Sequence, residues 1–139
     1  LDHQIERAAS LALGEIFTLH GEDYYRRLER ETLVDLLASG RSMVVAVGGG
    51  LVTSRETYAL LRQRATTVWL KARAADYWNR VIRQGDRRPI EQHPQAREAL
   101  LALVAGRDPL YAHAALTVDT AGLSVAKAVD RVERALQAG

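Results

Sequence analysis

A run of apolar residues from Met43 to Val47 limits the fold more than any other segment, because Gly48-Gly49-Gly50 follows it at once. A continuous β-branched run is typical of a parallel strand that is covered on both faces. Ligands in open α/β sheets bind beyond the carboxyl ends of such strands. Glycine leaves room there for a ligand to approach the backbone closely. The segment therefore predicts a buried strand whose end, at Gly48, Gly49 and Gly50, lines a ligand pocket; the alternative is a flexible turn.

The remaining pattern alternates strands with helices. Two more strands are predicted at Thr66–Leu70 and Ala115–Thr120. Such alternation predicts parallel βαβ units in a three-layer α/β/α fold. The 139 residues fit one domain, 1–139, with a polar, proline-bearing, lid-like loop at about 84–97. Helices are predicted at Asp2–Ala9, Ala12–Leu19, Glu22–Ala38, Thr53 or Ser54 to Arg64, Ala74–Arg83, Gln95–Ala105 and Ser124–Leu136.

Composition excludes several classes of function. There is no cysteine, so disulfides, thiol catalysis and thiolate zinc sites are ruled out, and a reducing cytoplasm is the expected location. No apolar run approaches the roughly 18 residues of a membrane span. A formal net charge of +2 is too small for a nucleic-acid footprint. No metal site is predicted, because the four histidines lack metal-ligand spacing: His3, His20, His93 and His113.

Several charged residues are candidates for chemistry. Asp2 is expected at the edge of the site, where its carboxylate could accept a hydroxyl hydrogen or simply cap a helix. Arg26 and Glu29 lie three residues apart on one helix face, as either a surface ion pair or a cation turned into a cleft. Arg88, in the loop, and Arg107 are spaced as in a lid that brings positive charge over a phosphate, or as in a basic solvated loop.

Taken together, these segments resemble the shikimate kinase family, a branch of the P-loop nucleoside monophosphate kinase fold. The resemblance runs in order along nearly the whole chain and implies an α/β fold of the P-loop kinase type. The matching stretches are Asp2-x-x-Ile5-Glu6, Gly14–Phe17, Gly21-Glu22, Tyr25–Glu29, Val44–Gly50, Arg87-Arg88-Pro89, Arg107–Tyr111 and Val118–Thr120.

The resemblance also implies roles for single residues. The aspartate matching Asp2 would hydrogen-bond the shikimate hydroxyl and assist its deprotonation, and the lid arginine matching Arg88 would reach the transferred phosphate. Arginines matching Arg26 and Arg107 would hold the shikimate carboxylate. Three further roles are implied: Glu29 orients Arg26, the glycines at 48, 49 and 50 line the pocket, and Arg80 or Arg83 stacks on adenine.

One motif of the family is missing from the sequence. The phosphate-binding pattern Gly-x-x-x-x-Gly-Lys-Ser/Thr occurs nowhere in the 139 residues. The resemblance places that loop, with the first strand, upstream of Asp2, so the domain is expected to be N-terminally incomplete. ATP and Mg²⁺ are then expected only in the complete domain, and whether the chain belongs to an enzyme is left open.

A second resemblance sets the main functional hypothesis. Part of the chain resembles the shikimate-kinase-like C-terminal domains of helix-turn-helix, benzoyl-CoA-responsive transcriptional regulators. The residues that carry this resemblance are Leu1, Thr67–Ala72, Arg80-Val81 and Gln84–Pro89. This resemblance implies a sensor of an aromatic CoA thioester that controls aromatic-acid catabolism. Its partners would be benzoyl-CoA, a second copy in a homodimer, and DNA through an N-terminal domain outside this chain, with no membrane. The alternative is a shikimate kinase, which transfers the γ-phosphate of ATP to the 3-hydroxyl of shikimate.

Overall fold

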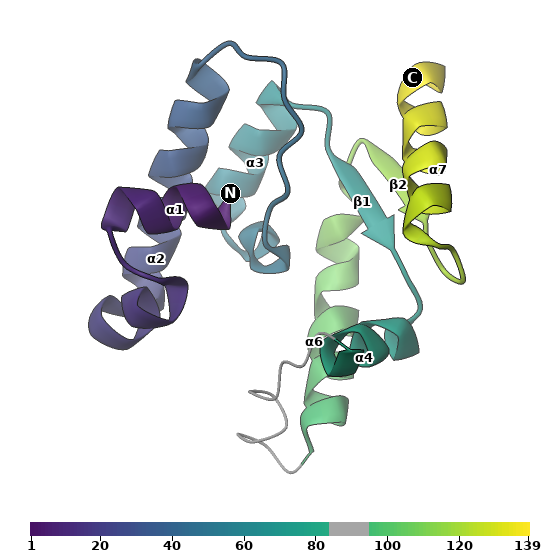
Figure 1. Ribbon diagram of the computed structural model, residues 1–139, viewed down its shortest axis with the longest axis horizontal. Coiled ribbons are helices and arrows are strands. Elements are labelled where there is room, and N and C mark those ends of the chain that lie inside the picture. The colour runs from purple at the N-terminus through teal and green to yellow at the C-terminus, as the bar shows by residue number, and fades with distance from the viewer. Residues whose placement is uncertain (84–94) are drawn as a thin grey trace. The chain divides into compact units, whose positions relative to one another are not determined.

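The alternation of helices and strands is present in the computed structural model, which describes residues 1–83 and 95–139 (Figure 1). The chain divides into two compact units, Leu1–Ala65 and Thr66–Gly139. Helices build the first unit, whereas the second contains a parallel pair of strands together with helices. Over the described ranges, no helix is long and apolar enough to cross a membrane. The single domain expected over residues 1–139 stays a prediction.

The core of the first unit lies between α1 (Asp2–Ala9) and α2 (Leu13–Ala38). Ile5 and Ile16 are fully buried and Tyr25 is 5% exposed, and these three side chains form the centre of an apolar cluster. Each buried aliphatic side chain contributes about 1.5–3 kcal/mol, so the cluster holds the two helices together. Partly buried residues complete it: Leu1, Ala9, Leu11, Leu13, Tyr24 and Leu28.

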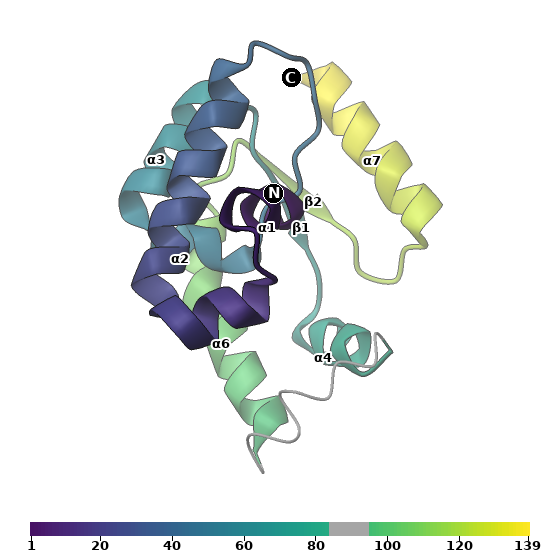
Figure 2. The ribbon, with the colours of Figure 1, turned by 60° about the vertical axis from the view of Figure 1, so that its left-hand side comes forward.

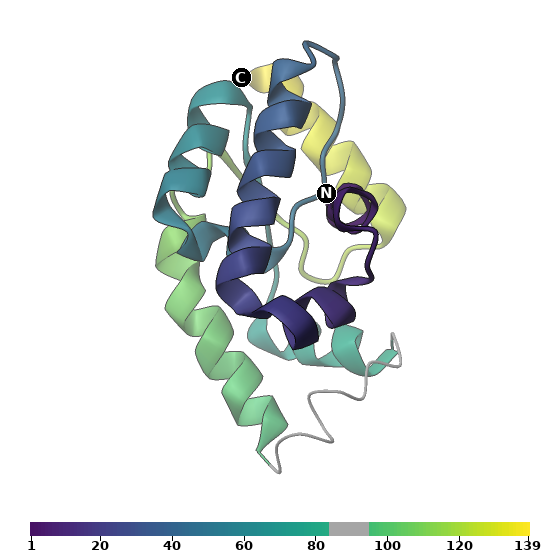
Figure 3. The same cartoon turned by 90° about the vertical axis from the view of Figure 1, so that its left-hand side faces the viewer.

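Helix α2 is two helical segments separated at Gly21. This residue has φ 81° and ψ 177°, a conformation that only glycine adopts without strain. The turn in the chain is visible at the purple end of α2 in Figure 3. The sequence-based expectation of two helices, Ala12–Leu19 and Glu22–Ala38, is therefore confirmed. The break lets Ile16 face the core in the first segment while Tyr25 faces it in the second.

The apolar run Met43–Val47 departs from the expectation. It forms no paired strand in the described structure, and Val44 is fully exposed. A parallel strand needs a neighbour on at least one edge to satisfy its backbone groups. Here the partner recorded for this run is the ammonium group of Leu1, which donates to the carbonyl oxygen of Ala46 at 2.9 Å. The prediction of a strand buried on both faces is wrong for this structure.

The glycine segment turns directly into short helices. Gly49–Thr53 forms the 3₁₀-helix η1, and Ser54 precedes α3 (Arg55–Arg64), as the sequence predicted. Leu51 in η1 and Leu61 in α3 are buried. Helix α3 lies beside α2, as Figure 2 shows. The glycines are thereby held next to the helix that carries Arg26.

The second unit is organised around two parallel strands, β1 (Val68–Lys71) and β2 (Leu116–Asp119). Val68 pairs with Leu116 and Lys71 with Asp119, and both strands match their predicted positions. Helices α4 (Ala74–Arg83) and α6 (Ala96–Tyr111) pack on each other, and α7 (Val125–Ala138) packs along β2 (Figure 1). The parallel pairing confirms an α/β chain.

Helix α6 is longer than the sequence predicted. It continues past Ala105 through Pro109 to Tyr111. Proline lacks an N–H group and usually ends a helix. At the last turn it removes a single hydrogen bond, and the amide of Ala112 still donates to the carbonyl of Asp108 at 3.0 Å. Arg107 therefore lies on a regular helix rather than in a loop.

The first prediction concerns the core of the first unit. Ile16→Ala should lower the free energy of unfolding by about 2–5 kcal/mol, because it removes buried methyl groups and leaves a cavity. Leu19→Ala, on the same helical segment but 65% exposed, should change it by less than about 0.5 kcal/mol. Urea unfolding followed by circular dichroism measures both. Equal losses would show that α1 and α2 are not held by this cluster.

Candidate functional site

The arginine–glutamate pair of α2 is the best-defined polar feature of the first unit. Nη1 of Arg26 donates to Oε1 of Glu29 at 3.0 Å, and the Glu29 side chain is completely buried. The Arg26 side chain is 20% exposed, so part of it remains accessible to solvent. A buried carboxylate needs a partner, and removing one member of such a pair destabilises by about 3–5 kcal/mol. The pair is therefore not the exposed surface bridge that the spacing also allowed.

Two more residues of α2 complete the surroundings of the guanidinium group. Nη2 of Arg26 lies 3.5 Å from Oε1 of Glu22, a side chain that is 68% exposed. The hydroxyl of Tyr25 donates to Oε2 of Glu29 at 3.1 Å. The Nε atom of Arg26 is buried and has no hydrogen-bond partner among the described residues. The guanidinium group is thus held by Glu29 and Glu22, and its Nε–H donor has no partner among the described residues.

Asp2 is the first residue of α1. Its Oδ1 atom is buried without a hydrogen-bond partner in the described structure, and Leu1, not Asp2, occupies the N-cap position. The negative charge of Asp2 acts on the Tyr25 hydroxyl, whose pKa is raised, first by burial and then by the charge of Glu29, with Asp2 third. The α1–α2 contact therefore brings a carboxylate with an unused acceptor into the surroundings of Tyr25.

Gly50 lies close to the guanidinium group of Arg26. A Cβ atom at this position would overlap Nη2 of Arg26 and would lie 3.2 Å from its Cζ atom. Gly48 has no other group within 4 Å of such a Cβ atom. Gly49 is the first residue of η1. At Gly50, therefore, the absence of a side chain has a clear steric reason.

Arg107 belongs to the second unit, on α6. Its Nε atom and Oδ1 of Asp108 are buried without partners among the described residues. Arg107 also acts on Tyr111, whose pKa is raised by burial and lowered in part by the charge and hydrogen bond of this arginine. The Tyr111 ring lies 5.7 Å from that of Trp69 in β1. Arg107 therefore keeps an Nε donor without a partner among the described residues, and it lies beside Tyr111, whose ring packs near that of Trp69.

The other predicted arginines are placed differently. Arg80 and Arg83 lie exposed on α4. Arg88 and most of the 84–97 loop lie outside the described residues. Asp2, Arg26, Glu29 and Gly50 are thus grouped in the first unit, whereas Arg80, Arg83 and Arg107 belong to the second. Within residues 1–83 and 95–139, no group of three or more His, Cys, Asp or Glu side chains is arranged to hold a metal.

Sequence reasoning missed the part played by the Tyr25 hydroxyl. The side chain of Tyr25 is buried. Its spacing of four residues from Glu29 places the two side chains on one helical face, and this spacing is the signal that could have pointed to their hydrogen bond. The spacing alone does not reveal that Glu29 is buried.

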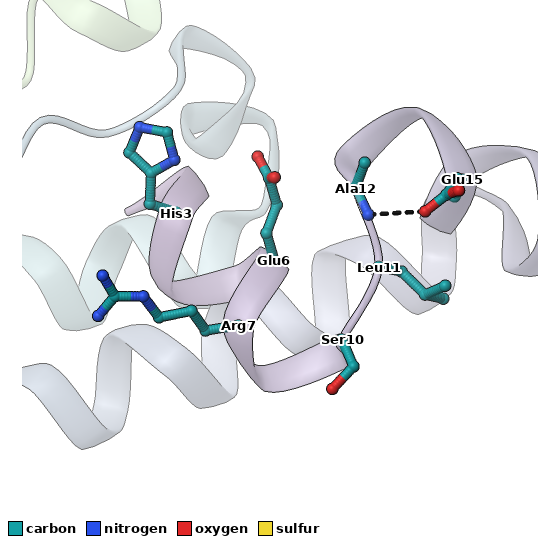
Figure 4. A pocket seen from close by; sticks show the side chains of 7 residues that line it. All are labelled: His3, Glu6, Arg7, Ser10, Leu11, Ala12 and Glu15. Carbon is teal, nitrogen blue, oxygen red and sulfur yellow. Dashed lines mark hydrogen bonds between the residues drawn. The ribbon is translucent and has the colours of Figure 1, made fainter.

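A separate hollow lies where α1 meets α2 (Figure 4). Its volume is about 370 Å³ and its lining is mostly polar. The carboxylate of Glu15 accepts a hydrogen bond from the amide of Ala12 at 2.9 Å, so this acid serves to cap α2. The hollow does not include Asp2, Arg26 or Gly50. It is lined by His3, Glu6, Arg7, Ser10, Leu11, Ala12 and Glu15.

Comparison with known proteins identifies the family. The shikimate kinase family model matches residues 1–137. The chain is 38% identical to the shikimate kinase of Cereibacter sphaeroides over 97% of its own length and 67% of that protein. It is 41% identical to the shikimate kinase of Nitrobacter winogradskyi over 84% of its own length and 54% of that protein. The chain belongs to the shikimate kinase family, and it spans roughly half to two thirds of the length of these two relatives.

Solved structures agree with this assignment. A shikimate kinase from Acinetobacter baumannii in complex with shikimate aligns with a TM-score of 0.80 and 31% identity, over 99% of this chain and 74% of that one. The shikimate kinase of Aquifex aeolicus aligns with a TM-score of 0.79 and 25% identity, over 99% and 77% of the two chains. The predicted α/β fold of the shikimate kinase type is confirmed.

These relatives overturn the main functional hypothesis. The chain was predicted to be a benzoyl-CoA-sensing domain of a transcriptional regulator, whereas the relatives described above are shikimate kinases. The regulator resemblance depended on Leu1 and on the Thr67–Pro89 stretch. Leu1 packs against the core cluster, so an apolar residue at this position has a structural reason. The regulator hypothesis, with its benzoyl-CoA ligand, is wrong.

The second prediction tests the close approach of Gly50 to Arg26. Gly50→Ala should displace the guanidinium group of Arg26. Binding of a carboxylate ligand should then weaken by about tenfold or more, because the charge-assisted hydrogen bond between the ligand and Arg26 is partly lost. Gly14→Ala adds the same methyl group near the start of α2, where nothing lies within 4 Å, so it should leave affinity unchanged. Calorimetric titration of the full-length variants with shikimate makes the comparison. Equal affinities for the two variants would mean that the Gly50–Arg26 contact does not shape the site.

Proposed function

We propose that the full-length protein is a shikimate kinase, which transfers a phosphoryl group from ATP to the 3-hydroxyl of shikimate. Family membership supports this proposal, and the observation that carries it is the presence, in one helical unit, of two polar atoms without hydrogen-bond partners among the described residues. These atoms are Nε of Arg26, whose guanidinium group is held by Glu29, and Oδ1 of Asp2. A hydroxy acid such as shikimate offers the complementary carboxylate and hydroxyl groups.

The proposed role of Arg26 is to hold the substrate carboxylate. A guanidinium group presents several N–H donors in a planar fork that matches a carboxylate. Arg107, whose Nε atom has no partner among the described residues, is proposed as a further carboxylate-binding arginine. We propose that Gly48, Gly49 and Gly50 form the adjoining floor.

The proposed role of Asp2 is to accept the hydrogen of the reacting hydroxyl. Its Oδ1 atom has no competing donor among the described residues. A carboxylate so placed orients the hydroxyl oxygen for attack on the γ-phosphorus of ATP. It takes up the hydroxyl proton as the new oxygen–phosphorus bond forms and the bond from the γ-phosphorus to the bridging oxygen breaks, with ADP as the leaving group. The proton passes from the substrate oxygen to Asp2 and then to solvent.

ATP with Mg²⁺ is proposed as the phosphoryl donor of the full-length protein. Residues 1–139 do not fit this group by themselves, because they lack the Gly-x-x-x-x-Gly-Lys-Ser/Thr pattern and the described part offers no acidic cluster for a cation. No step through the metal is therefore derived. Contact of Arg80 or Arg83 with adenine, and of Arg88 with the transferred phosphate, are proposals, as are a homodimer and a cytoplasmic location.

The third prediction tests the carboxylate site. Arg26→Ala should raise the KM for shikimate by about two orders of magnitude, since a charge-assisted, forked contact is lost. Arg30→Ala provides the control on the same helix, because Arg30 makes an exposed ion pair with Glu56 at 2.9 Å and such pairs contribute little. ADP release in a coupled assay of the full-length protein measures both. A protein without any shikimate-dependent ADP release would contradict the proposed function.

The fourth prediction tests Asp2. Asp2→Asn keeps the shape of the side chain but cannot accept the proton, so kcat should fall by about 10²- to 10⁴-fold with a smaller change in KM. Asp23→Asn, at an exposed position of α2, should change neither constant. An Asp2 variant that retains the wild-type kcat would assign this carboxylate to ligand binding or helix stability only.

A further inference from the structure

The carboxylate of Glu29 is held at both of its oxygen atoms. Oε1 accepts from Nη1 of Arg26 at 3.0 Å, and Oε2 accepts from the hydroxyl of Tyr25 at 3.1 Å. The Glu29 side chain is fully buried, so no water competes for either oxygen. Rotation of the carboxylate would break both hydrogen bonds at once. Its orientation, and with it the direction in which Arg26 points, therefore depends on the tyrosine as well as on the arginine.

We propose that Tyr25 is a positioning residue, whose hydroxyl fixes the Glu29 carboxylate and thereby orients the Arg26 fork toward its ligand. The identity of that ligand as shikimate depends on the function proposed above. The positioning itself depends only on the contacts among these three side chains.

Tyr25 is suited to this task because its ring is anchored. It belongs to the core cluster with Ile5 and Ile16, and its ring centroid lies 4.6 Å from that of Phe17. A ring that is held on several sides leaves its hydroxyl little freedom to move. The Cζ atom of Arg26 also lies 5.2 Å from the Tyr25 ring centroid, so the tyrosine contacts the arginine directly and through Glu29.

The hydroxyl also remains a hydrogen-bond donor at every physiological pH. Burial raises the pKa of Tyr25 well above its usual value, the charges of Glu29 and Asp2 raise it further, and Arg26 opposes them in part. The phenol therefore stays protonated, and its proton is available to Oε2 of Glu29.

The other anchor of Arg26 is weaker. Glu22 lies 3.5 Å from Nη2 and is 68% exposed, so solvent screens this contact and the side chain retains its rotamer freedom. Gly50 has no side chain that could hold the guanidinium group, and Nη2 of Arg26 lies where its Cβ atom would be. The buried Tyr25–Glu29 arrangement is consequently the part of the site that can fix the guanidinium plane.

The test uses Tyr25→Phe in the full-length protein, because phenylalanine keeps the ring in the core and removes only the hydroxyl. Tyr24→Phe is the matched control: Tyr24 packs on the same cluster, but its ring contacts are with His20 and Arg27. The first readout is steady-state kinetics. Tyr25→Phe should raise the KM for shikimate by about five- to tenfold, the range expected for loss of one hydrogen bond, with kcat within twofold, and Tyr24→Phe should change neither.

A double-mutant cycle with Arg26→Lys separates positioning from a structural role. Lysine has no planar fork to orient, so Tyr25→Phe should have no further effect on KM in the Arg26→Lys background. A fold-change that is the same in both backgrounds would overturn the proposal. A lower melting temperature with an unchanged KM would overturn it too, because that pattern describes a tyrosine that only supports the core.

The second readout needs no substrate. ¹⁵N NMR of the Arg26 side chain should show separate Nη signals in the wild type, because rotation about the Nε–Cζ bond is hindered, and merged signals in Tyr25→Phe. If the wild type failed to bind shikimate while Tyr25→Phe still released the guanidinium group, the proposed function would fail and the positioning would stand. Arg26 signals and a KM that were both unchanged by Tyr25→Phe would overturn the positioning itself.

Discussion

The burial of the Glu29 carboxylate is the constraint on which the first unit depends. An isolated charge cannot be moved out of water without strong compensation, and here the compensation comes from Arg26 and Tyr25 at separate oxygens. Both partners lie on the same helix, so α2 carries the whole arrangement. The apolar cluster of Ile5, Ile16 and Tyr25 thereby also supports the ion pair, because Tyr25 belongs to the cluster and hydrogen-bonds Glu29.

Much of the fold could be predicted from local signals. Gly21 marks the break between two helical segments, and the β-branched runs at β1 and β2 are paired where the sequence placed them. The failures have a common physical origin. Met43–Val47 has the composition of a buried strand, but pairing requires a neighbour that composition does not supply. Likewise the helix predicted at Gln95–Ala105 continues to Tyr111, because the final turn of α6 tolerates Pro109.

The candidate site was predictable in its residues and not in its geometry. The spacing of Arg26 and Glu29 put them on one helix face, yet it fits a solvated bridge as well as a buried pair. Burial is a tertiary property, which depends on the elements that pack against α2, among them α1 and α3. The functional interpretation failed for a related reason. Leu1 was taken as a sign of a regulator, but a residue that packs into a core varies with its neighbours rather than with the ligand.

The close approach of Gly50 to Arg26 has a consequence for how this sequence can change over evolution. A side chain at position 50 takes the space of the guanidinium group, so a substitution there moves the end of the Arg26 side chain. An alanine or serine at 50 would leave the arginine in the sequence and still alter the ligand contact proposed for it. We therefore expect selection at position 50 to act through position 26, although the two lie 24 positions apart in the chain.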